Sequence, residues 1–400
     1  MKFIKIVGNH NENTDEKNDI KNNTIKYTAE FIKEISKGFI SAGINNEIII
    51  YNESFEKLEK RNFKNPIKNI CELKTIKNFG LIICLKYNLH FFDLKNFTLK
   101  NIILEDSEKP NFSFFLKINE SECLICFKEE AIYYSDLFSD IVKTNQNRIK
   151  IKSVKNAIRL NNKYSALIIC NICSRQNEIR FYKNNLNKLM NKMVRKENCS
   201  LVSTINGLTV MPREEIDLNN KILLCACKKY LKYQKNGILL VNLEFKENEI
   251  NDFNINSHFY STGHFEVYCF CPLLIIKNNK IINKNDLKII DTEYFLVGGF
   301  NLDKNKGEIK LYKVFYGNNF SENKIEYIED INIETNDNLK NLRGPISSII
   351  QDKSNERGNL LISCWDGNVY LFSLLNIECY IKYDEKIKNN ILFYDLFGYK

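Results

Sequence analysis

The stretch GNLLISCWDGNVYLFSL at positions 358–374 decides the fold. Leu360–Cys364 is a short apolar strand, and Asn368–Phe372 reads as the strand that returns beside it. Between them, Asp366 and Gly367 predict a tight turn, because glycine tolerates a positive φ and aspartate bonds back to the following backbone. The stretch therefore predicts one β-hairpin.

The second strand of this hairpin has apolar or aromatic side chains on both faces. Side chains alternate along a strand, so Val369 and Leu371 share one face and Tyr370 and Phe372 share the other. Each face of the predicted hairpin thus has a matched pair.

The same pattern of apolar strand, polar turn and second strand recurs upstream. Its earlier copies lie at 38–52, 79–94, 121–136, 164–183, 220–243 and 293–314. A small residue ends each first strand: Gly43, Cys84, Cys126, Cys170, Cys225, Gly298 and Cys364. Their spacings are 41, 42, 44, 55, 73 and 66 residues, and the first three match the roughly 40–45 residue period of a four-stranded propeller blade. The surplus in the others lies in polar segments at 245–261, 277–291 and 316–341, which we expect in loops at the propeller faces.

Short apolar stretches around the hairpins supply the remaining strands. Inner strands are predicted at 67–73, 112–118, 153–160, 207–212, 265–271 and 345–350, and outer strands at 98–104 and 378–383. A propeller joins its first and last blades to avoid an exposed edge. The outer strand of the last blade could be either of two segments, Phe3–Val7 or Glu378–Tyr383. Asn184–Lys196 alone has the spacing of a short helix.

These observations predict one all-β domain, a β-propeller of seven four-stranded blades closed by N- and C-terminal strands. The expected blades are 27–63, 64–108, 109–150, 151–196, 197–261, 262–342 and 343–383, with a tail at 384–400. The hairpin at 363–372 resembles the hairpin between the second and third strands of WD40-type propellers, in which aspartate precedes glycine in the turn. The Trp-Asp pair of that family appears here as Phe92-Asp93, and its Gly-His pair as Gly263-His264. The resemblance implies a non-catalytic scaffold that binds other proteins.

Composition narrows the class of protein. The net charge of +9, from 58 basic and 49 acidic residues, is spread along the chain without a long basic block. We therefore expect no strong nucleic-acid or membrane signal. The 13 cysteines lie mostly in apolar runs, and neither a signal peptide nor a membrane span is evident, so we expect a soluble, cytoplasmic protein with free thiols.

The cysteine pairs have spacings that suggest metal ligands. They are Cys123 with Cys126, Cys170 with Cys173, Cys225 with Cys227, and Cys269 with Cys271. Residues three apart in a strand point to opposite faces, so the first two pairs would need a bulge to share an ion. We interpret these cysteines as small core residues and expect no metal and no other cofactor.

Histidine and glycine motifs give little sign of catalysis. His90 lies in the middle of a strand, and we interpret it as structural. His264 follows Gly263 just before an inner strand. We favour a structural role for it, in which its hydrogen bonds cap a blade, rather than a catalytic role. No phosphate-binding loop and no nucleophile elbow occur, so we expect no enzyme.

The candidate binding residues precede inner strands: Arg213, His264 and Arg343. We expect their face to bind a protein or peptide, alone or within a larger complex. The basic run at 228–235 is interpreted as the solvated tip of a long hairpin. Gly298 is expected at a bulge or close backbone approach, and Trp365 as a packing residue or an exposed contact.

Two other functions remain open from the sequence. One is a surface binder of phosphoinositide membranes or nucleic acid, which would use the dispersed basic loops. Asn341–Pro345 weakly resembles the Phe-Arg-Arg-Gly signature of phosphoinositide-binding propellers, with one arginine in place of two. The other is an enzyme with its site in the central channel.

Overall fold

The computed structural model places most of the expected strands. It describes residues 2–9, 29–36, 38–43, 45–74, 79–102, 111–117, 122–127, 130–135, 148–150, 154–160, 164–171, 176–183, 196–198, 204–211, 220–228, 235–245, 253–273, 275–277, 288–290, 294–317, 322–331, 342–352 and 359–373. Within these residues the strands form seven four-stranded sheets and one two-stranded ribbon. The chain divides into two compact units, Met1–Lys60 with Thr209–Lys228 and Asn236–Lys400, and Arg61–Leu208 with Lys229–Lys235.

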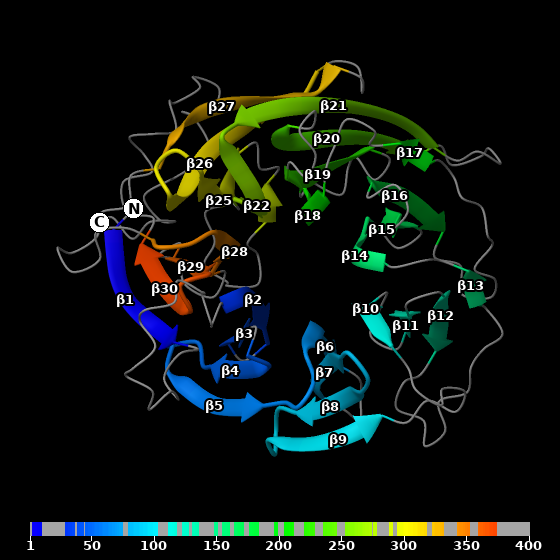
Figure 1. The fold of residues 1–400 in the computed structure, drawn as a ribbon, viewed down its shortest axis with the longest axis vertical. Helices are drawn as coiled ribbons and strands as arrows, with labels where there is room; N and C mark the ends of the chain where they lie inside the picture. Colours follow the sequence, from blue (N-terminus) through cyan, green and yellow to red (C-terminus); the bar gives the residue numbers. More distant parts are fainter. Residues whose placement is uncertain are drawn as a thin grey trace. The chain divides into compact units, whose positions relative to one another are not determined.

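The first unit contains two complete sheets and most of two others, in which β5 or β18 crosses the boundary of the units (Figure 1). One sheet has the order β1 (Lys2–Asn9), β30 (Asn368–Ser373), β29 (Asn359–Cys364) and β28 (Ile346–Gln351). The next consists of β2 (Ala29–Ile35), β3 (Gly38–Gly43), β4 (Glu47–Tyr51) and β5 (Lys57–Asn62). A third has β22 (Phe265–Pro272), β25 (Tyr294–Asn301), β26 (Lys306–Phe315) and β27 (Lys324–Asp330). The fourth has β18 (Thr204–Val210), which spans the boundary of the units, β19 (Asn220–Lys228), β20 (Asn236–Phe245) and β21 (Phe253–Gly263). The ribbon is β23 (Ile275–Lys277) with β24 (Lys288–Ile290).

The second unit contains the other three sheets. They are β6 (Ile67–Lys74), β7 (Phe79–Leu85), β8 (Leu89–Asp93) and β9 (Thr98–Ile102); β10 (Phe112–Lys117), β11 (Glu122–Phe127), β12 (Glu130–Ser135) and β13 (Arg148–Lys150); and β14 (Val154–Arg159), β15 (Tyr164–Asn171), β16 (Gln176–Lys183) and β17 (Lys196–Asn198). In each sheet, strands that follow one another along the chain are neighbours.

The hairpin at 358–374 has the predicted structure. β29 and β30 pair in antiparallel register from Asn359 opposite Ser373 to Ser363 opposite Val369. The turn closes with a 3.1 Å hydrogen bond from the Gly367 amide to the Cys364 carbonyl, and Gly367 has a φ of 92°. The turn prediction is confirmed, because this backbone conformation favours glycine.

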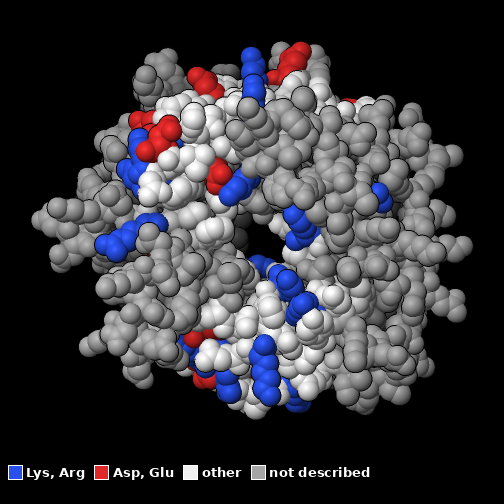
Figure 2. Space-filling model, viewed as in Figure 1, with Lys and Arg blue, Asp and Glu red and all other residues white. Residues whose placement is uncertain are grey.

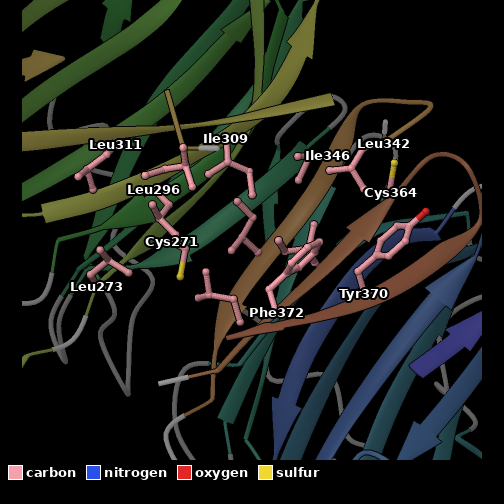
Figure 3. Close-up of a cluster of buried hydrophobic side chains, with 14 of the residues drawn as sticks. Cys271, Leu273, Leu296, Ile309, Leu311, Leu342, Ile346, Cys364, Tyr370 and Phe372 are labelled. Carbon is pink, nitrogen blue, oxygen red and sulfur yellow. The ribbon is translucent and has the colours of Figure 1, made fainter. Parts of the chain in front are cut away.

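The two faces of β30 pack against different neighbours, as the alternation predicts. Val369 and Leu371 join a buried cluster with Ile49 of β4. Tyr370 and Phe372 join another buried cluster, which Figure 3 shows between β22, β25 and β26 on one side and β28, β29 and β30 on the other. Because the sheet is covered on both faces, β29 is buried along its whole length, which explains its continuous apolar run.

The strand β1 lies beside β30 at the outer edge of the last sheet (Figure 1). Its register runs from Lys2 opposite Ser373 to Asn9 opposite Asn368, with two irregularities. The chain's first described strand thus completes the sheet made by its last three. Its predicted competitor at 378–383 lies outside the described residues, as does the tail at 384–400.

The polar segments expected as loops contain strands, which corrects that expectation. β21 occupies 253–263 and β27 occupies 324–330, each as the outer strand of its sheet, and β24 lies within 277–291. In β27 only Ile325 is buried. An outer strand faces water along one edge, so its sequence is nearly as polar as that of a loop. Of the predicted helix, residues 184–195 lie outside the described residues, and Lys196 begins β17.

Candidate functional site

In the sheet of β22 and in the sheet of β28, one end carries two features. They are the turn between the second and third strands and the segment that precedes the inner strand. In one sheet Phe265 lies opposite Asn301, and in the next Ile346 lies opposite Cys364. Backbone hydrogen bonds tie the two kinds of segment together, from the Leu302 amide to the His264 carbonyl at 3.1 Å and from the Trp365 amide to the Pro345 carbonyl at 3.0 Å. We call this end the turn face.

The structure places two of the three predicted binding residues on the turn face. His264 follows Gly263, whose φ is 63°, and its imidazole is 74% exposed. Its Nδ1 lies 3.3 Å from the carboxylate of Asp303 in the turn between β25 and β26. The imidazole thus joins the segment before β22 to the turn of the same sheet.

Arg343 is exposed immediately before β28. Among the described residues it makes no ion pair. Arg213 lies outside the described residues. The structure therefore puts His264 and Arg343 on the turn faces of two sheets and shows no contact between them.

A polar cluster that the sequence analysis missed joins β19 to β22 on the turn face. The Lys228 ammonium lies 2.8 Å from Glu266 Oε2 and donates a 2.8 Å hydrogen bond to the Tyr268 hydroxyl. The Tyr268 hydroxyl in turn donates to Glu266 Oε2 at 3.1 Å. Lys228 was expected at a solvated tip, but it ends β19, and its side chain is only 33% exposed.

The ionisation of this cluster follows from its contacts. Burial acts to lower the pKa of Lys228, but its hydrogen bonds and attraction to Glu266 and Tyr268 outweigh this effect and raise the pKa. Burial raises the pKa of Tyr268, against the opposing effect of the ammonium. Lys228 therefore stays charged and Tyr268 neutral near neutral pH.

Trp365 extends this cluster into the next sheet. Its ring meets Tyr268 edge to face, with centroids 5.2 Å apart and planes at 73°, and Lys228 Nζ lies 5.2 Å from the centre of the Tyr268 ring. Trp365 is half-buried, so the indole both packs and remains accessible. Gly344 lies against it, since a Cβ there would stand 3.0 Å from the Trp365 Cβ.

Asp366 fixes the turn that carries Trp365. One carboxylate oxygen accepts a 2.6 Å hydrogen bond from the Tyr370 hydroxyl, and the other accepts a 3.0 Å bond from the Asn368 amide. Burial, with the nearby Asp366 carboxylate, raises the pKa of Tyr370. The phenol therefore remains a donor to Asp366.

A second polar cluster lies on β26 and β27. Buried Glu308 accepts a 2.8 Å hydrogen bond from Asn301 Nδ2 and pairs with Lys304 Nζ at 2.9 Å. Lys310 pairs with Asp330, whose carboxylate also accepts a 3.0 Å bond from the Tyr327 hydroxyl. Figure 2 shows acidic and basic side chains side by side over β26 and β27, and again over β22. Much of the basic charge here is thus paired within the protein.

The described cysteines are chiefly packing residues. Cys123, Cys126, Cys225 and Cys227 are fully buried. Burial raises the pKa of Cys84 to about 12, so this thiol is neutral at ordinary pH. Cys173 lies outside the described residues. Within the described part of the chain, no three histidine, cysteine, aspartate or glutamate residues are arranged to hold a metal ion.

His90 lies in β8, 8% exposed, with its ring centre 5.8 Å from that of Phe63. Burial lowers the pKa of His90, against a hydrogen bond with Asn101. The imidazole is therefore neutral at physiological pH, as suits a packed residue.

Among the described residues, no helix has the length and apolar character needed to cross a bilayer.

Known proteins share this chain's fold without sharing its sequence. No protein-family model and no curated protein sequence matches it. The Pan2 WD40 domain of Neurospora crassa superposes with a TM-score of 0.53 at 8% identity, over 87% of this chain and 90% of that one. The β-propeller domain of Cps50 (Swd1) from Myceliophteria thermophila gives 0.53 at 8% identity, over 87% and 97%. BBS1N, solved in complex with ARL6DN, gives 0.50 at 9% identity, over 87% and 92%. This chain therefore has the fold of the WD40-type β-propellers.

Proposed function

We propose that the chain is one seven-bladed propeller closed by β1. The seven four-stranded sheets formed by the described residues and the pairing of β1 with β30 support this arrangement. We propose the blade limits expected from the sequence, from 27–63 to 343–383, except that β17 and β21 extend two residues past the limits at 196 and 261.

We propose further that this propeller is a non-catalytic scaffold that binds a protein or peptide through its turn face. The observation that carries the proposal is the half-buried Trp365, which a rigid turn holds beside Tyr268 and against Gly344, the residue that follows the exposed Arg343. Tryptophan, tyrosine and arginine are enriched where proteins bind one another. The complex of BBS1N with ARL6DN is one case of a chain with this fold bound to another protein.

The contacts of the turn face favour a scaffold over the two rival functions. Glu266 is paired with Lys228, and the Tyr268 hydroxyl bonds to both, so this cluster offers no free acid or base for catalysis. Lys304 and Lys310 are also paired with carboxylates, which reduces the charge left for an anionic surface. Nine of the described cysteines form no disulfide, which is consistent with a reducing compartment, and we propose the cytoplasm.

The test is affinity capture with the full chain as bait and mass spectrometry as readout. The variant reverses charge on the turn face through Arg213→Glu, His264→Glu and Arg343→Glu. The matched control carries Lys95→Glu, Lys100→Glu and Lys324→Glu, at three exposed positions away from the turn face. Lys95 lies in the turn between β8 and β9, Lys100 lies on the outer strand β9, and Lys324 lies on the outer strand β27. Circular dichroism checks that both variants fold.

We expect proteins captured by the wild type to be lost with the turn-face variant and kept with the control. If the turn-face variant captures every wild-type partner unchanged, the proposal is wrong. Binding to anionic liposomes or RNA that falls steeply with salt would instead favour the surface binder.

A further inference from the structure

The outer strand β21 differs from the other outer strands in its lack of charge. Its 11 residues, FNINSHFYSTG, include no lysine, arginine, aspartate, glutamate or proline. Each of the six other outer strands, β1, β5, β9, β13, β17 and β27, has at least one charged residue. Charged residues and proline on an outer strand discourage pairing with a further strand. β21 therefore lacks the residues that keep the other outer strands from pairing.

The free edge of β21 is long and regular. Its register with β20 runs from Phe253 opposite Phe245 to Gly263 opposite Asn236, with one irregularity beside Gly263. No strand in the described part of the chain pairs with its other edge. Alternate residues of a strand direct their backbone N–H and C=O groups to the same side, so about half of β21 presents both groups to that edge. None of the residues at 254–263 is buried, so these groups are open to a further strand.

The sequence of β21 is complementary to itself in antiparallel orientation. When two copies overlap along the whole strand, His258, the sixth of the 11 residues, lies opposite His258 of the second copy. Phe259 then lies opposite the second copy's Ser257, and Tyr260 lies opposite its Asn256. Each of these aromatic residues is thus opposite a smaller one. No pair of lysines, arginines or carboxylates meets, and such like-charged pairs are what destabilise a ladder of strands.

The described charges at the ends of the neighbouring strand β20 do not oppose this pairing. Glu244 lies opposite Asn254 and accepts a 2.8 Å hydrogen bond from its side-chain amide. Lys235 immediately precedes β20 at its other end. Because antiparallel pairing reverses one copy, the Glu244 end of one sheet comes beside the Lys235 end of the other, and these charges have opposite signs.

We propose that β21 is a dimerisation strand, which pairs with β21 of a second copy of this chain and joins two four-stranded sheets into one of eight strands. The second copy supplies a strand of the same length that is also uncharged. A two-fold dimer uses the same surface on both subunits, which requires this kind of self-complementarity. A single pair of strands buries less area than a standard interface, so the dimer is reversible, with a dissociation constant of about 10 µM. The inference does not rest on the proposed function.

Sedimentation equilibrium of the full chain tests the dimer. We expect the mass of a monomer at about 1 µM and that of a dimer at about 100 µM. Hydrogen exchange read by mass spectrometry at both concentrations then locates the interface. The amides of β21 should exchange about tenfold more slowly at the higher concentration, whereas those of the outer strand β27 should exchange at the same rate.

Two double variants in the middle of β21 separate charge from side-chain size. Ser257→Lys with His258→Lys brings four ammonium groups together in the dimer and should weaken association about tenfold or more. Ser257→Gln with His258→Gln is the matched control, since it removes the same side chains and adds long polar ones without charge. The control should associate nearly as well as the wild type. Circular dichroism checks that both variants fold.

Three results would each overturn the inference. They are a monomeric mass at the highest concentration, a dimer in which exchange from β21 is unchanged, and equal association of the lysine and glutamine variants. None of them bears on the proposed function, because affinity capture tests residues of the turn face.

Discussion

Gly298 occupies a place in β25 where no side chain fits. A Cβ there would stand 2.6 Å from Cys269 Sγ, 2.8 Å from Ile346 Cγ2 and 2.9 Å from Ile349 Cδ1. Gly298 lies opposite Cys269 in its own sheet, and the two isoleucines come from β28. The close contact between these strands therefore depends on the absence of a side chain.

Gly298→Ala should lower the free energy of unfolding by about 1–3 kcal/mol, because the new methyl group must displace packed atoms. Urea denaturation measures the change. Leu302→Ala, at a turn residue that is 46% exposed, should change stability by about 0.5 kcal/mol or less. A Gly298→Ala protein as stable as the wild type would show that β28 moves aside without cost.

At the scale of residues, the sequence predicts a local structure correctly when that structure depends only on the residues that form it. Asp366 and Gly367 predict their turn, because the required φ and the aspartate hydrogen bond involve only nearby backbone. Lys228, Glu266 and Tyr268 come from strands about 40 residues apart. Their contact depends on how two sheets pack, which no local pattern records.

Glu308 links three parts of one sheet. It accepts from Asn301 and pairs with Lys304 in the turn, and it lies 3.8 Å from Lys310, which pairs with Asp330 on β27. Burial acts to raise the pKa of Glu308, but the hydrogen bond from Asn301 and the two ammonium groups outweigh this effect and lower it. The carboxylate is thus stabilised in its charged form.

Glu308→Gln should destabilise the protein by about 2 kcal/mol at neutral pH, because charged hydrogen bonds are lost while the lysines remain. A lowered carboxyl pKa stabilises the fold above the ordinary value of 4.5, and this stability is lost as pH falls through the folded-state pKa. The difference between wild type and variant should therefore shrink below about pH 4.5. Urea denaturation at a series of pH values measures it.

Glu326→Gln serves as the control on the same strand. Glu326 is exposed, so its substitution should leave stability nearly unchanged at each pH. A Glu308→Gln effect that is as large at pH 3 as at pH 7 would contradict the electrostatic explanation.

The strand β1 should stabilise the sheet that it completes. Its described residues give six register partners on β30, and half-buried Val7 packs against the cluster that contains Val369 and Leu371. Deleting residues 2–9 would leave β30 as an exposed edge, which invites pairing between chains. We expect the truncated chain to be less stable and to associate, as measured by urea denaturation and light scattering.

Val7→Ala retains the backbone pairing and is the matched control. It should remain monomeric and lose only the packing of two methyl groups, about 1 kcal/mol. A truncated chain with wild-type stability and mass would show that β1 is dispensable for the last sheet.

At the scale of elements, the sequence predicts buried strands better than outer ones. Second and third strands such as β3, β4 and β29 are buried along their whole length, so their sequences are largely apolar. Outer strands such as β5, β9 and β27 have mostly exposed or half-buried residues. Hydrophobicity distinguishes such strands poorly from loops: the outer strand predicted at 98–104 is present as β9, but 253–263 and 324–330 were not predicted as strands.

Stability of the whole molecule should fall at alkaline pH. Burial raises the pKa of several acidic groups, Cys84 and Tyr327 to about 12 and Cys126, Cys269 and Tyr312 in the same direction. A raised folded-state pKa means that the unfolded chain loses its protons first. These groups therefore stabilise the fold below their ordinary values of 9.0 for thiols and 10.0 for phenols, and their contribution declines as pH rises towards 12.

Urea denaturation from pH 7 to pH 11 should show a midpoint that decreases above about pH 9. Alkylation and peptide mapping at pH 8 should find Cys84 and Cys126 unreactive in the native chain and reactive in denaturant. A midpoint that stays constant to pH 11 would show that these groups ionise without cost to the fold.

The chain divides into two compact units, and the prediction of a single domain requires that they unfold together. Trp365, the only tryptophan, reports on the first unit, whereas far-ultraviolet circular dichroism reports on the strands of both. We expect the two signals to give the same urea midpoint, because a single domain unfolds in one cooperative transition. A second reporter, Tyr87→Trp in a Trp365→Phe background, places the fluorophore in an exposed turn of the second unit. If the two fluorescence midpoints differ, the units unfold separately and the single-domain prediction is wrong; if they coincide with each other and with circular dichroism, the repeats act as one cooperative propeller.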